Sequence, residues 1–549
     1  MTRAADDATY ADWLWLLAWA LASSAWCITA AARLGATFDE PVYLARGLDL
    51  WRTGSHGGLI KLGTMPLPID VCTLPLGLWE RWRGVQLDAA ADVVRALPWA
   101  RAGTLVFWWV LLVYGWGAGR QLAGRWGGRL AVAWLACEPN LLAHASLATT
   151  DLALAACLLA LLYHFRTARE AASSARFGAP LFWGVATILS KASGVFYAPL
   201  CLLAVELERV GLRDALRQRA ALRRDIGRLL GWALLVVFLY CGSDWRTEPS
   251  FVEWAQHLPD SVTGDLMRPI AEHLRIFPNA GEALVRQIRH GIRGHGYGAY
   301  LLGTVRPTFW YYFPVALGIK LTLPLLAMPL LLLLLAPRAL VNWANAAAAA
   351  LLAFSLTSRV QIGIRFVLPL IALAVVGLAA SLVQAQQRAT AAWMRRLGVM
   401  AAAGSIVWST TAAVHAWPDA LRYTNELCGG SERGYRCLSD SNYDWGQGLP
   451  ELGQWQQAHA AAPLDVWYFG SDPRLTALPM RLVRLHALPI AGAADVLEQV
   501  RGRYLAVSTT LLYGTLMSPA HRIAAEFLRA RAPIARTTTF FIYDFTHTS

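Results

Sequence analysis

The stretch FVLPLIALAVVGLAASLVQ, residues 366–384, contains no charged side chain. An α-helix needs about 20 mainly apolar residues to cross the hydrocarbon core of a bilayer, so this segment predicts a transmembrane helix. The composition of the whole chain agrees, because 56% of its 549 residues are hydrophobic and only 15% are charged. Soluble domains average about 45–50% apolar and about 25% charged residues. The composition excludes a disordered chain and favours an integral membrane protein over a cytosolic enzyme.

Ten further segments are long or apolar enough to be predicted as transmembrane helices as well. We therefore predict an all-α polytopic membrane protein with about eleven transmembrane helices. The first segment is expected to remain in the protein rather than to be a cleaved signal peptide, because it is long and no clear cleavage site follows it. The remaining predicted spans are 12–32, 98–119, 130–146, 151–166, 179–191, 194–208, 229–242, 309–335, 343–357 and 397–415.

The net charge of +13 is concentrated in five loops between these segments. Cytoplasmic loops of membrane proteins carry an excess of Lys and Arg, so we expect all five on the cytoplasmic side, with the N-terminus. The loop with the most arginines, 209–228, could alternatively be a patch that binds nucleic acid. Because membrane topology explains the arginines of all five loops, no nucleic-acid partner is expected. The arginine-bearing loops are 120–129, 166–176, 209–228, 338 and 388–396.

The opposite side of the membrane then holds most of the unusual polar residues. We expect the protein in the inner (plasma) membrane, with these segments on its periplasmic or external side. They are 33–97, 147–150, 243–308, 358–365 and everything after about residue 416.

The last part of the chain differs from the rest. Residues 416–549 are less apolar and contain the strand-like runs 464–470, 502–510 and 537–545. We therefore predict a transmembrane domain over 1–415 and a small external α/β domain over 416–549. In the latter, Cys428 and Cys437 flank a glycine-rich loop, and an oxidising compartment would favour a disulfide between them over two free thiols.

Three acidic residues on the external side are candidates for chemistry. Asp39 and Glu40 directly follow the first span, and Asp151 begins the span 151–166. A carboxylate at the membrane boundary can act as a general base on an acceptor hydroxyl or amine. The alternative is that Asp39 and Asp151 cap the helices that begin there. Sidedness places both at a similar depth, where they could form one acceptor or cation site.

Two basic residues on the same side are candidates for binding an anion. Lys191 interrupts the apolar region between two spans, and Arg365 stands at the external start of span 366–384. Either could bind a phosphate. The alternatives are a lysine whose ammonium reaches the interface and an arginine that contacts lipid headgroups. Arg359, near Arg365, departs from the positive-inside trend in the same way.

Other chemistries find no support in the motifs. The histidines of segment 243–308 match no zinc signature such as HExxH, so no structural metal is expected. The glycine-rich stretch 294–303 lacks the GxxxxGK[ST] pattern of a nucleotide-binding loop, and no GxSxG motif is present. If a divalent cation does bind, Asp39 and Asp151 are its expected oxygen ligands.

Several motifs together resemble a known family. FDEPVYLARG (38–47), TTD (149–151) and LSKASG (189–194) are similar in order and sidedness to motifs of the polytopic C-type (GT-C) glycosyltransferases. The nearest group is glycosyltransferase family 39, which includes the protein O-mannosyltransferases and the lipid A aminoarabinose transferase. The resemblance extends over most of residues 35–470, through the stretches GHGYGAYLLG (294–303), WYYFPVALGIKLTLPLL (310–326), IGIRFVLPL (362–370) and YTNELCGGSERGYRCLSDSNYDWGQGLPEL (423–452).

The resemblance implies a sugar donor linked to polyprenyl phosphate and an inverting transfer on the external face. It implies Asp39 as the catalytic base with Glu40 beside it, Asp151 as a second acidic site residue, and Lys191 and Arg365 as binding groups for the donor phosphate. The acceptor is a lipid, a glycan or a protein. One departure is that KLGTMPLPID (61–70) replaces the family's His/Lys-Pro-Pro-Leu motif, which leaves His56 and Lys61 as weak candidates.

Two other classes of function compete with the transferase. A transporter or flippase for a lipid-linked precursor would also place charged groups at membrane depth, but the inverted repeats that often mark transporters are not visible in the sequence. A scaffold whose tail binds an envelope partner is the third class. The acidic pair in a large external loop favours the transferase.

Overall fold

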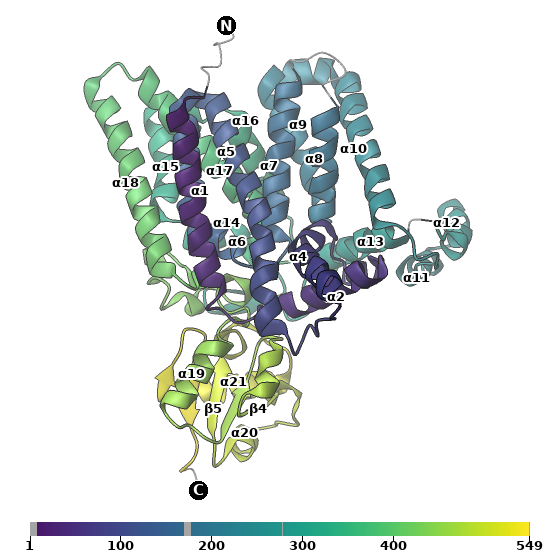
Figure 1. Cartoon of the computed structure of the whole chain (residues 1–549), viewed down its shortest axis with the longest axis vertical. Helices are drawn as coiled ribbons and strands as arrows, with labels where there is room; N and C mark the ends of the chain where they lie inside the picture. Colours follow the sequence, from purple (N-terminus) through teal and green to yellow (C-terminus); the bar gives the residue numbers. More distant parts are fainter. Residues whose placement is uncertain (1–7, 170–176, 277, 548–549) are drawn as a thin grey trace.

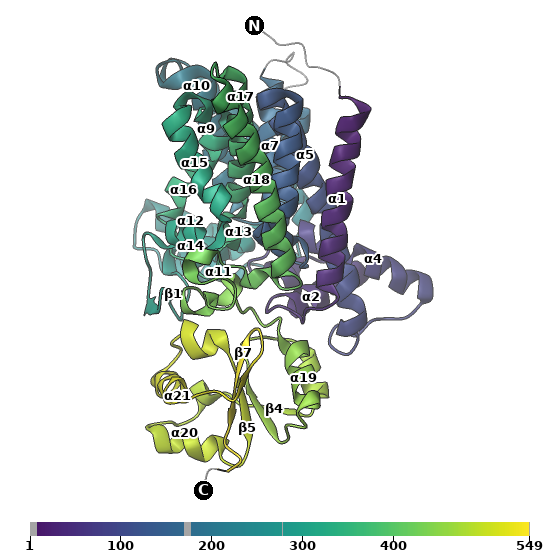
Figure 2. The same cartoon turned by 90° about the vertical axis from the view of Figure 1, so that its left-hand side faces the viewer.

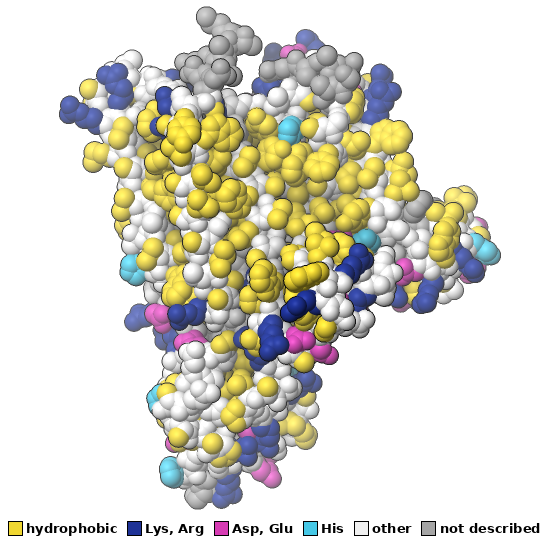
Figure 3. Space-filling view, in the orientation of Figure 1, with side chains coloured by type: hydrophobic (Ala, Val, Ile, Leu, Met, Phe, Trp, Pro, Cys, Tyr) yellow, Lys and Arg dark blue, Asp and Glu magenta, His cyan; other side chains and the backbone are white. Residues whose placement is uncertain are grey.

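The computed structural model describes residues 8–169, 177–276 and 278–547. A bundle of long helices forms the upper body, and a small domain with a β-sheet lies below it, at the end of the bundle opposite the N-terminus (Figure 1). On the face shown in Figure 3, apolar side chains form a broad belt across the bundle, whereas charged side chains gather at its two ends. The architecture is that of a multi-pass membrane protein with an extramembrane α/β domain.

The helices of the bundle overlap all eleven predicted spans. Among the described residues, five helices are long and apolar enough to cross a membrane, or six if one bent pair forms a single span. The most buried is α17, which lies at the centre of the bundle. The bundle helices are α1 (Tyr10–Ala31), α5 (Val93–Cys137), α6 (Pro139–Ala145), α7 (Asp151–Ala168), α8 (Gly178–Ser190), α9 (Gly194–Arg217), α10 (Arg219–Cys241), α14 (Tyr312–Lys320), α15 (Leu323–Leu335), α16 (Trp343–Ser355), α17 (Leu368–Arg388) and α18 (Ala392–Ala416).

Helix α5 is a hairpin rather than one straight rod. Its backbone leaves the helical conformation at Ala123 and at Gly124, whose φ of 74° suits glycine. A Cβ atom added to Gly119 would lie 2.5 Å from the carbonyl oxygen of Gly127, so the two halves touch at their glycines. Small residues permit such close helix contacts in membranes. The first half matches predicted span 98–119, and the second half with α6 matches 130–146.

The predicted single span 309–335 needs correction. It forms two helices, α14 and α15, that bend by 111° at Leu321 and Thr322. A proline stands in the first turn of α15, and beside the break the Lys320 ammonium donates to the carbonyl oxygens of Leu421 (2.7 Å) and Asn442 (2.8 Å). A buried ammonium needs such hydrogen-bond partners.

The two sets of predicted loops lie at opposite ends of the bundle. The described arginine-bearing loops lie at the end that carries the N-terminus (Figure 1); Arg176 lies outside the described residues. The other end carries short helices and a two-stranded sheet beside the lower domain (Figure 2). These are α2 (Glu40–Thr53), α3 (Gly57–Ile60), α4 (Leu67–Arg83), α11 (Pro249–Gln256), α12 (Val262–His273), α13 (Pro278–Arg293), β1 (Ala299–Leu301) and β2 (Thr304–Arg306).

The lower domain contains a mixed five-stranded sheet of order β4-β3-β5-β7-β6. Strand β3 runs parallel to β4 and β5, while β7 runs antiparallel to β5 and β6. The three predicted strand runs are confirmed as β3, β5 and β7. The elements are β3 (Leu464–Trp467), β4 (Met480–Leu482), β5 (Tyr504–Ser508), β6 (Ala535–Arg536), β7 (Phe540–Asp544), α19 (Leu449–Ala458), α20 (Ala493–Val500) and α21 (Pro519–Arg529).

The cysteine pair of this region does not form the expected disulfide. Cys428 and Cys437 are both free in the structure. Cys428 ends the short 3-10 helix Glu426–Cys428, and Cys437 directly follows the 3-10 helix Gly434–Arg436. The structure therefore corresponds to the alternative of two free thiols.

Candidate active site

The loop that follows α1 is held against the bundle by a buried ion pair. Arg101 of α5 donates to both carboxylate oxygens of Glu40, at 2.8 and 2.6 Å, and neither side chain is exposed by more than 1%. Glu40 also accepts from the backbone N–H groups of Thr37 and Ala148, each at 2.8 Å. Its oxygens are therefore fully engaged. Although Glu40 adjoins Asp39 in the sequence, these contacts serve to fix the loop.

Asp39 faces away from this pair and toward α17. It occupies the N-cap position of α2, but its side chain makes no capping hydrogen bond. Instead, Arg365 donates from Nη1 to Asp39 Oδ2 at 2.8 Å. Asp39 remains 26% exposed, so solvent or a substrate can reach it. Capping thus accounts for the position of this residue but not for the direction of its side chain.

Asp151 and Lys191 join the same cluster from two other helices. Lys191, directly after α8, donates from Nζ to Asp151 Oδ1 at 2.5 Å. The other oxygen of Asp151 lies 3.9 Å from Arg365 Nη1. Asp151 is 1% exposed, whereas Lys191 is 13% exposed. Four candidates from distant parts of the sequence thus form one chain of alternating charges: Asp39, Arg365, Asp151 and Lys191.

Aromatic rings line the two cations. The guanidinium carbon of Arg365 lies 4.2 Å from the ring centroid of Trp445, and Lys191 Nζ lies 4.1 Å from that of Phe366. Cations over aromatic faces are stabilised electrostatically. Arg365 also keeps its buried Nε without a hydrogen-bond partner among the described residues. The cluster therefore holds two cations in fixed positions and leaves part of their binding capacity unused.

The sequence analysis missed a third carboxylate, Asp440. It lies in the segment before the lower domain, 4% exposed, and accepts from Tyr297 Oη at 2.9 Å. Its φ of 55° is in the left-handed region, which is uncommon for residues other than glycine. Burial raises the pKa of the Asp440 carboxyl to about 6, although the Arg365 guanidinium opposes this. The motif around it was quoted for the family resemblance, but nothing in the sequence brought it next to Arg365.

The raised pKa of Asp440 predicts a pH-dependent stability. Because the folded state holds this proton more tightly, stability falls as the pH rises from the unfolded pKa of 3.8 to about 6, and stays lower above it. Asp440→Asn cannot ionise, and asparagine tolerates left-handed backbone. We expect the stability of this variant relative to the wild type to be greater at about pH 7 than at about pH 5.

Thermal unfolding of the purified protein at the two pH values measures this difference. The matched control is Asp260→Asn, because the Asp260 side chain is 96% exposed. A difference that does not change with pH would refute the assignment.

The remaining candidates occupy other places. His144 and Glu138 are buried behind the cluster, and Glu138 caps α6 by accepting from the N–H of Leu141. His56 contacts Asp70 at 3.0 Å, and Arg359 donates to a backbone carbonyl at 3.1 Å. Lys61 is exposed, and among the described residues no ion pair joins it to the cluster.

A metal ion has no complete set of ligands at the cluster. Asp39 and Asp151 each face a cationic side chain. Within the described residues, no group of three or more His, Cys, Asp or Glu side chains is arranged to hold a metal ion. The two carboxylates predicted as cation ligands therefore fit a divalent cation poorly as they are placed.

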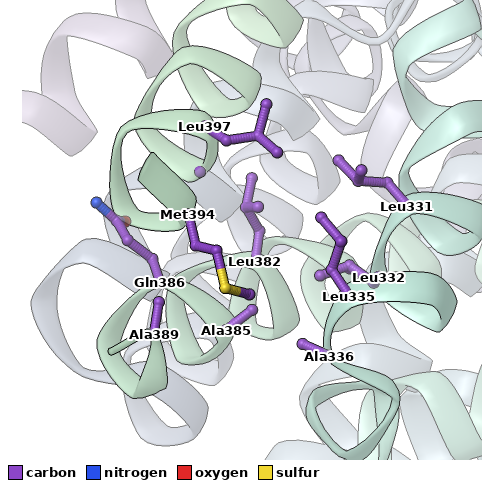
Figure 4. Close-up of a pocket in the computed structure, with 11 residues that line it drawn as sticks. Leu331, Leu332, Leu335, Ala336, Leu382, Ala385, Gln386, Ala389, Met394 and Leu397 are labelled. Carbon is purple, nitrogen blue, oxygen red and sulfur yellow. The ribbon is translucent and has the colours of Figure 1, made fainter. Parts of the chain in front are cut away.

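A small apolar cavity lies near the other end of the bundle and offers no such chemistry. Its volume is about 30 Å³, and no lining residue carries a charge. Leucine, alanine and methionine side chains of α15, α17 and α18 surround it, with Gln386 as the one amide (Figure 4). The charged cluster, rather than this cavity, is therefore the candidate active site.

Comparisons with known proteins find similar solved structures, two of which are described here. No family model matches the chain, and no curated protein matches it. One structure is ArnT from Cupriavidus metallidurans bound to undecaprenyl phosphate, with 14% identity and a TM-score of 0.45. The other is the same protein in the apo state, with 12% identity and a TM-score of 0.31. Both comparisons cover 96% of this chain and 97% of the other.

Proposed function

We propose that this chain is a membrane glycosyltransferase that moves a sugar from a polyprenyl-phosphate donor to an acceptor by inverting displacement. The supporting observation is the cluster itself, in which a partly exposed carboxylate, Asp39, lies 2.8 Å from a fixed cation, Arg365. The sequence motifs that carry the family resemblance supply these same residues. The sidedness of the arginine loops supports a position of the cluster on the periplasmic face.

The proposed reaction uses both the negative charge of Asp39 and the positive charges of Arg365 and Lys191. The bond between the sugar's anomeric carbon and the phosphate oxygen breaks, and its electron pair leaves with the polyprenyl phosphate. The acceptor oxygen or nitrogen attacks the opposite face of that carbon, and its proton passes to Asp39. Arg365 and Lys191 stabilise the developing negative charge on the phosphate electrostatically. Since no enzyme-bound sugar forms, the anomeric configuration inverts.

The other two carboxylates act through their neighbours in this proposal. Asp151, 1% exposed, keeps the Lys191 ammonium in place through their contact. Asp440 is close enough to Arg365 for their charges to attract, and it is itself held by the hydroxyl of Tyr297. The donor phosphate would then displace carboxylate oxygens as partners of the two cations.

Selective binding of a polyprenyl phosphate tests the donor site. We expect the purified protein to retain undecaprenyl phosphate in native mass spectrometry and to release undecaprenol, which lacks the phosphate. Hydrogen bonds to charged groups contribute about 1.5–3 kcal/mol, so Arg365→Gln and Lys191→Gln should each weaken retention about 10- to 100-fold. Arg359→Gln is the matched control, because Arg359 is exposed and outside the cluster.

Equal retention of the phosphate and the alcohol would refute the donor site. A transfer assay in detergent micelles then separates the transferase from a flippase, because micelles offer no second compartment. Radiolabel moving from a polyprenyl-phosphate sugar to extracted envelope lipids or glycans supports the transferase. Binding without any transfer, together with envelope changes in cells lacking the protein, would favour the flippase.

A further inference from the structure

A pair of short helices extends sideways from the bundle at the end that carries the cluster. Helices α11 and α12 pack against each other and form this lobe, residues 249–273 (Figure 1). The lobe is joined to α13 by an ion pair between Arg289 and Glu253, with Nη2 and Oε2 3.3 Å apart. Within α12 only Gly264 and Ala271 are buried, so little of this helix is covered by protein.

Helix α12 and the residues after it display an exposed apolar stripe. Val262, Leu266, Ile270 and Leu274 follow at intervals of four residues and are 86%, 58%, 37% and 42% exposed. Side chains four apart lie on the same face of a helix. Large apolar side chains rarely gather in this way on a surface that faces water, so the stripe indicates a partner.

The opposite face of α12 is polar. Asp265, Arg268 and Glu272 occupy it, and Arg268 pairs with Asp260 at 2.9 Å. Trp245, just before the lobe, is 68% exposed, and Trp254, in α11, is 39% exposed. An amphipathic helix flanked by tryptophans is typical of segments that lie in the plane of a membrane interface.

We propose that the α11–α12 lobe is an interfacial anchor whose apolar stripe inserts into the outer leaflet of the same bilayer. The belt of apolar side chains on the bundle continues at the height of the lobe, where apolar side chains are again visible (Figure 3). Because the belt faces lipid, a structure reaching sideways at that height meets the lipid surface. A bilayer therefore fits the stripe better than a second copy of the chain.

The anchor would hold the loop that completes the cluster. After the lobe the chain forms α13 and then reaches His295 and Tyr297, and Tyr297 donates to Asp440. Anchoring the lobe would thus fix the distance between this loop and the membrane surface. This inference does not depend on the reaction that the cluster performs.

Site-directed spin labelling of the full-length protein in lipid nanodiscs tests the anchor. Labels at Leu266→Cys and Ile270→Cys are compared with labels at Asp260→Cys and Asp265→Cys on the polar side of the same lobe, where the native side chains are 96% and 74% exposed. Cys428→Ser and Cys437→Ser remove the two accessible thiols, since the other six cysteines are buried.

Accessibility to oxygen, which concentrates in lipid, is measured against accessibility to a water-soluble nickel complex. We expect labels at 266 and 270 to lie about 5–10 Å into the headgroup and acyl boundary, and labels at 260 and 265 to remain in water. Equal nickel accessibility at all four positions would refute the anchor. Shielding of 266 and 270 from both reagents would refute it as well, because that result indicates a protein partner.

Discussion

Replacing Asp39 by asparagine is expected to lower the rate of sugar transfer about 10²- to 10⁴-fold, which is the usual contribution of a general base. Asparagine has nearly the same shape but cannot accept the acceptor's proton. The binding of the donor should not fall, because Arg365 loses its carboxylate partner at 2.8 Å and becomes freer to bind phosphate. A loss of rate without a loss of donor binding is the signature of a group that acts in the chemical step.

The measurement has two parts. Transfer in detergent micelles gives the rate, and native mass spectrometry gives the retention of undecaprenyl phosphate. Asp49→Asn is the matched control, because Asp49 lies on the same helix and its side chain is 48% exposed. In cells that lack the protein, wild type and Asp49→Asn should restore the envelope glycan, and Asp39→Asn should not. Restoration by Asp39→Asn at normal expression would reject the proposed role.

Much of the architecture could be predicted because the signals are local. A membrane helix is specified by its own apolar residues, and helices cover all eleven predicted segments. The predicted sidedness of the loops then indicated which residues, distant in the sequence, lie at the same end of the bundle. Since arginine-rich loops alternate with the segments that carry Asp39, Asp151, Lys191 and Arg365, topology alone placed these residues at one end of the bundle, where the structure brings them into contact.

The rest depends on contacts that no local pattern encodes. Asp39 and Glu40 are adjacent and chemically alike. Asp39 is nevertheless partly exposed at the cluster, whereas Glu40 is fully buried and paired with Arg101. Only the packing of α5 against the loop separates them. Asp440 and Trp445 come from a segment more than 70 residues beyond Arg365, and the carbonyl oxygens that the Lys320 ammonium contacts are 101 and 122 residues away from it.

Removing the buried cation beneath the loop should produce the largest loss of stability. Arg101→Met removes five hydrogen bonds, two to Glu40 and one each to the carbonyl oxygens of Ala31, Leu34 and Gly35. Glu40 would be left as an unpaired charge with no exposed surface. Breaking a buried pair in this way costs about 3–5 kcal/mol in the free energy of unfolding.

The second substitution Glu40→Gln separates the charge from the packing. Glutamine still accepts from the N–H of Thr37 or Ala148 but carries no charge, so Arg101→Met with Glu40→Gln should be more stable than Arg101→Met alone. The exposed pair of Arg46 and Asp49 provides the control, since Arg46→Met should cost at most about 1 kcal/mol. Unfolding of the full-length protein in one detergent measures all four variants. Two results would contradict the role of the pair in holding the loop that presents Asp39. One is that Arg101→Met loses no more free energy of unfolding than Arg46→Met. The other is that the loss in the double variant equals the sum of the losses in Arg101→Met and Glu40→Gln.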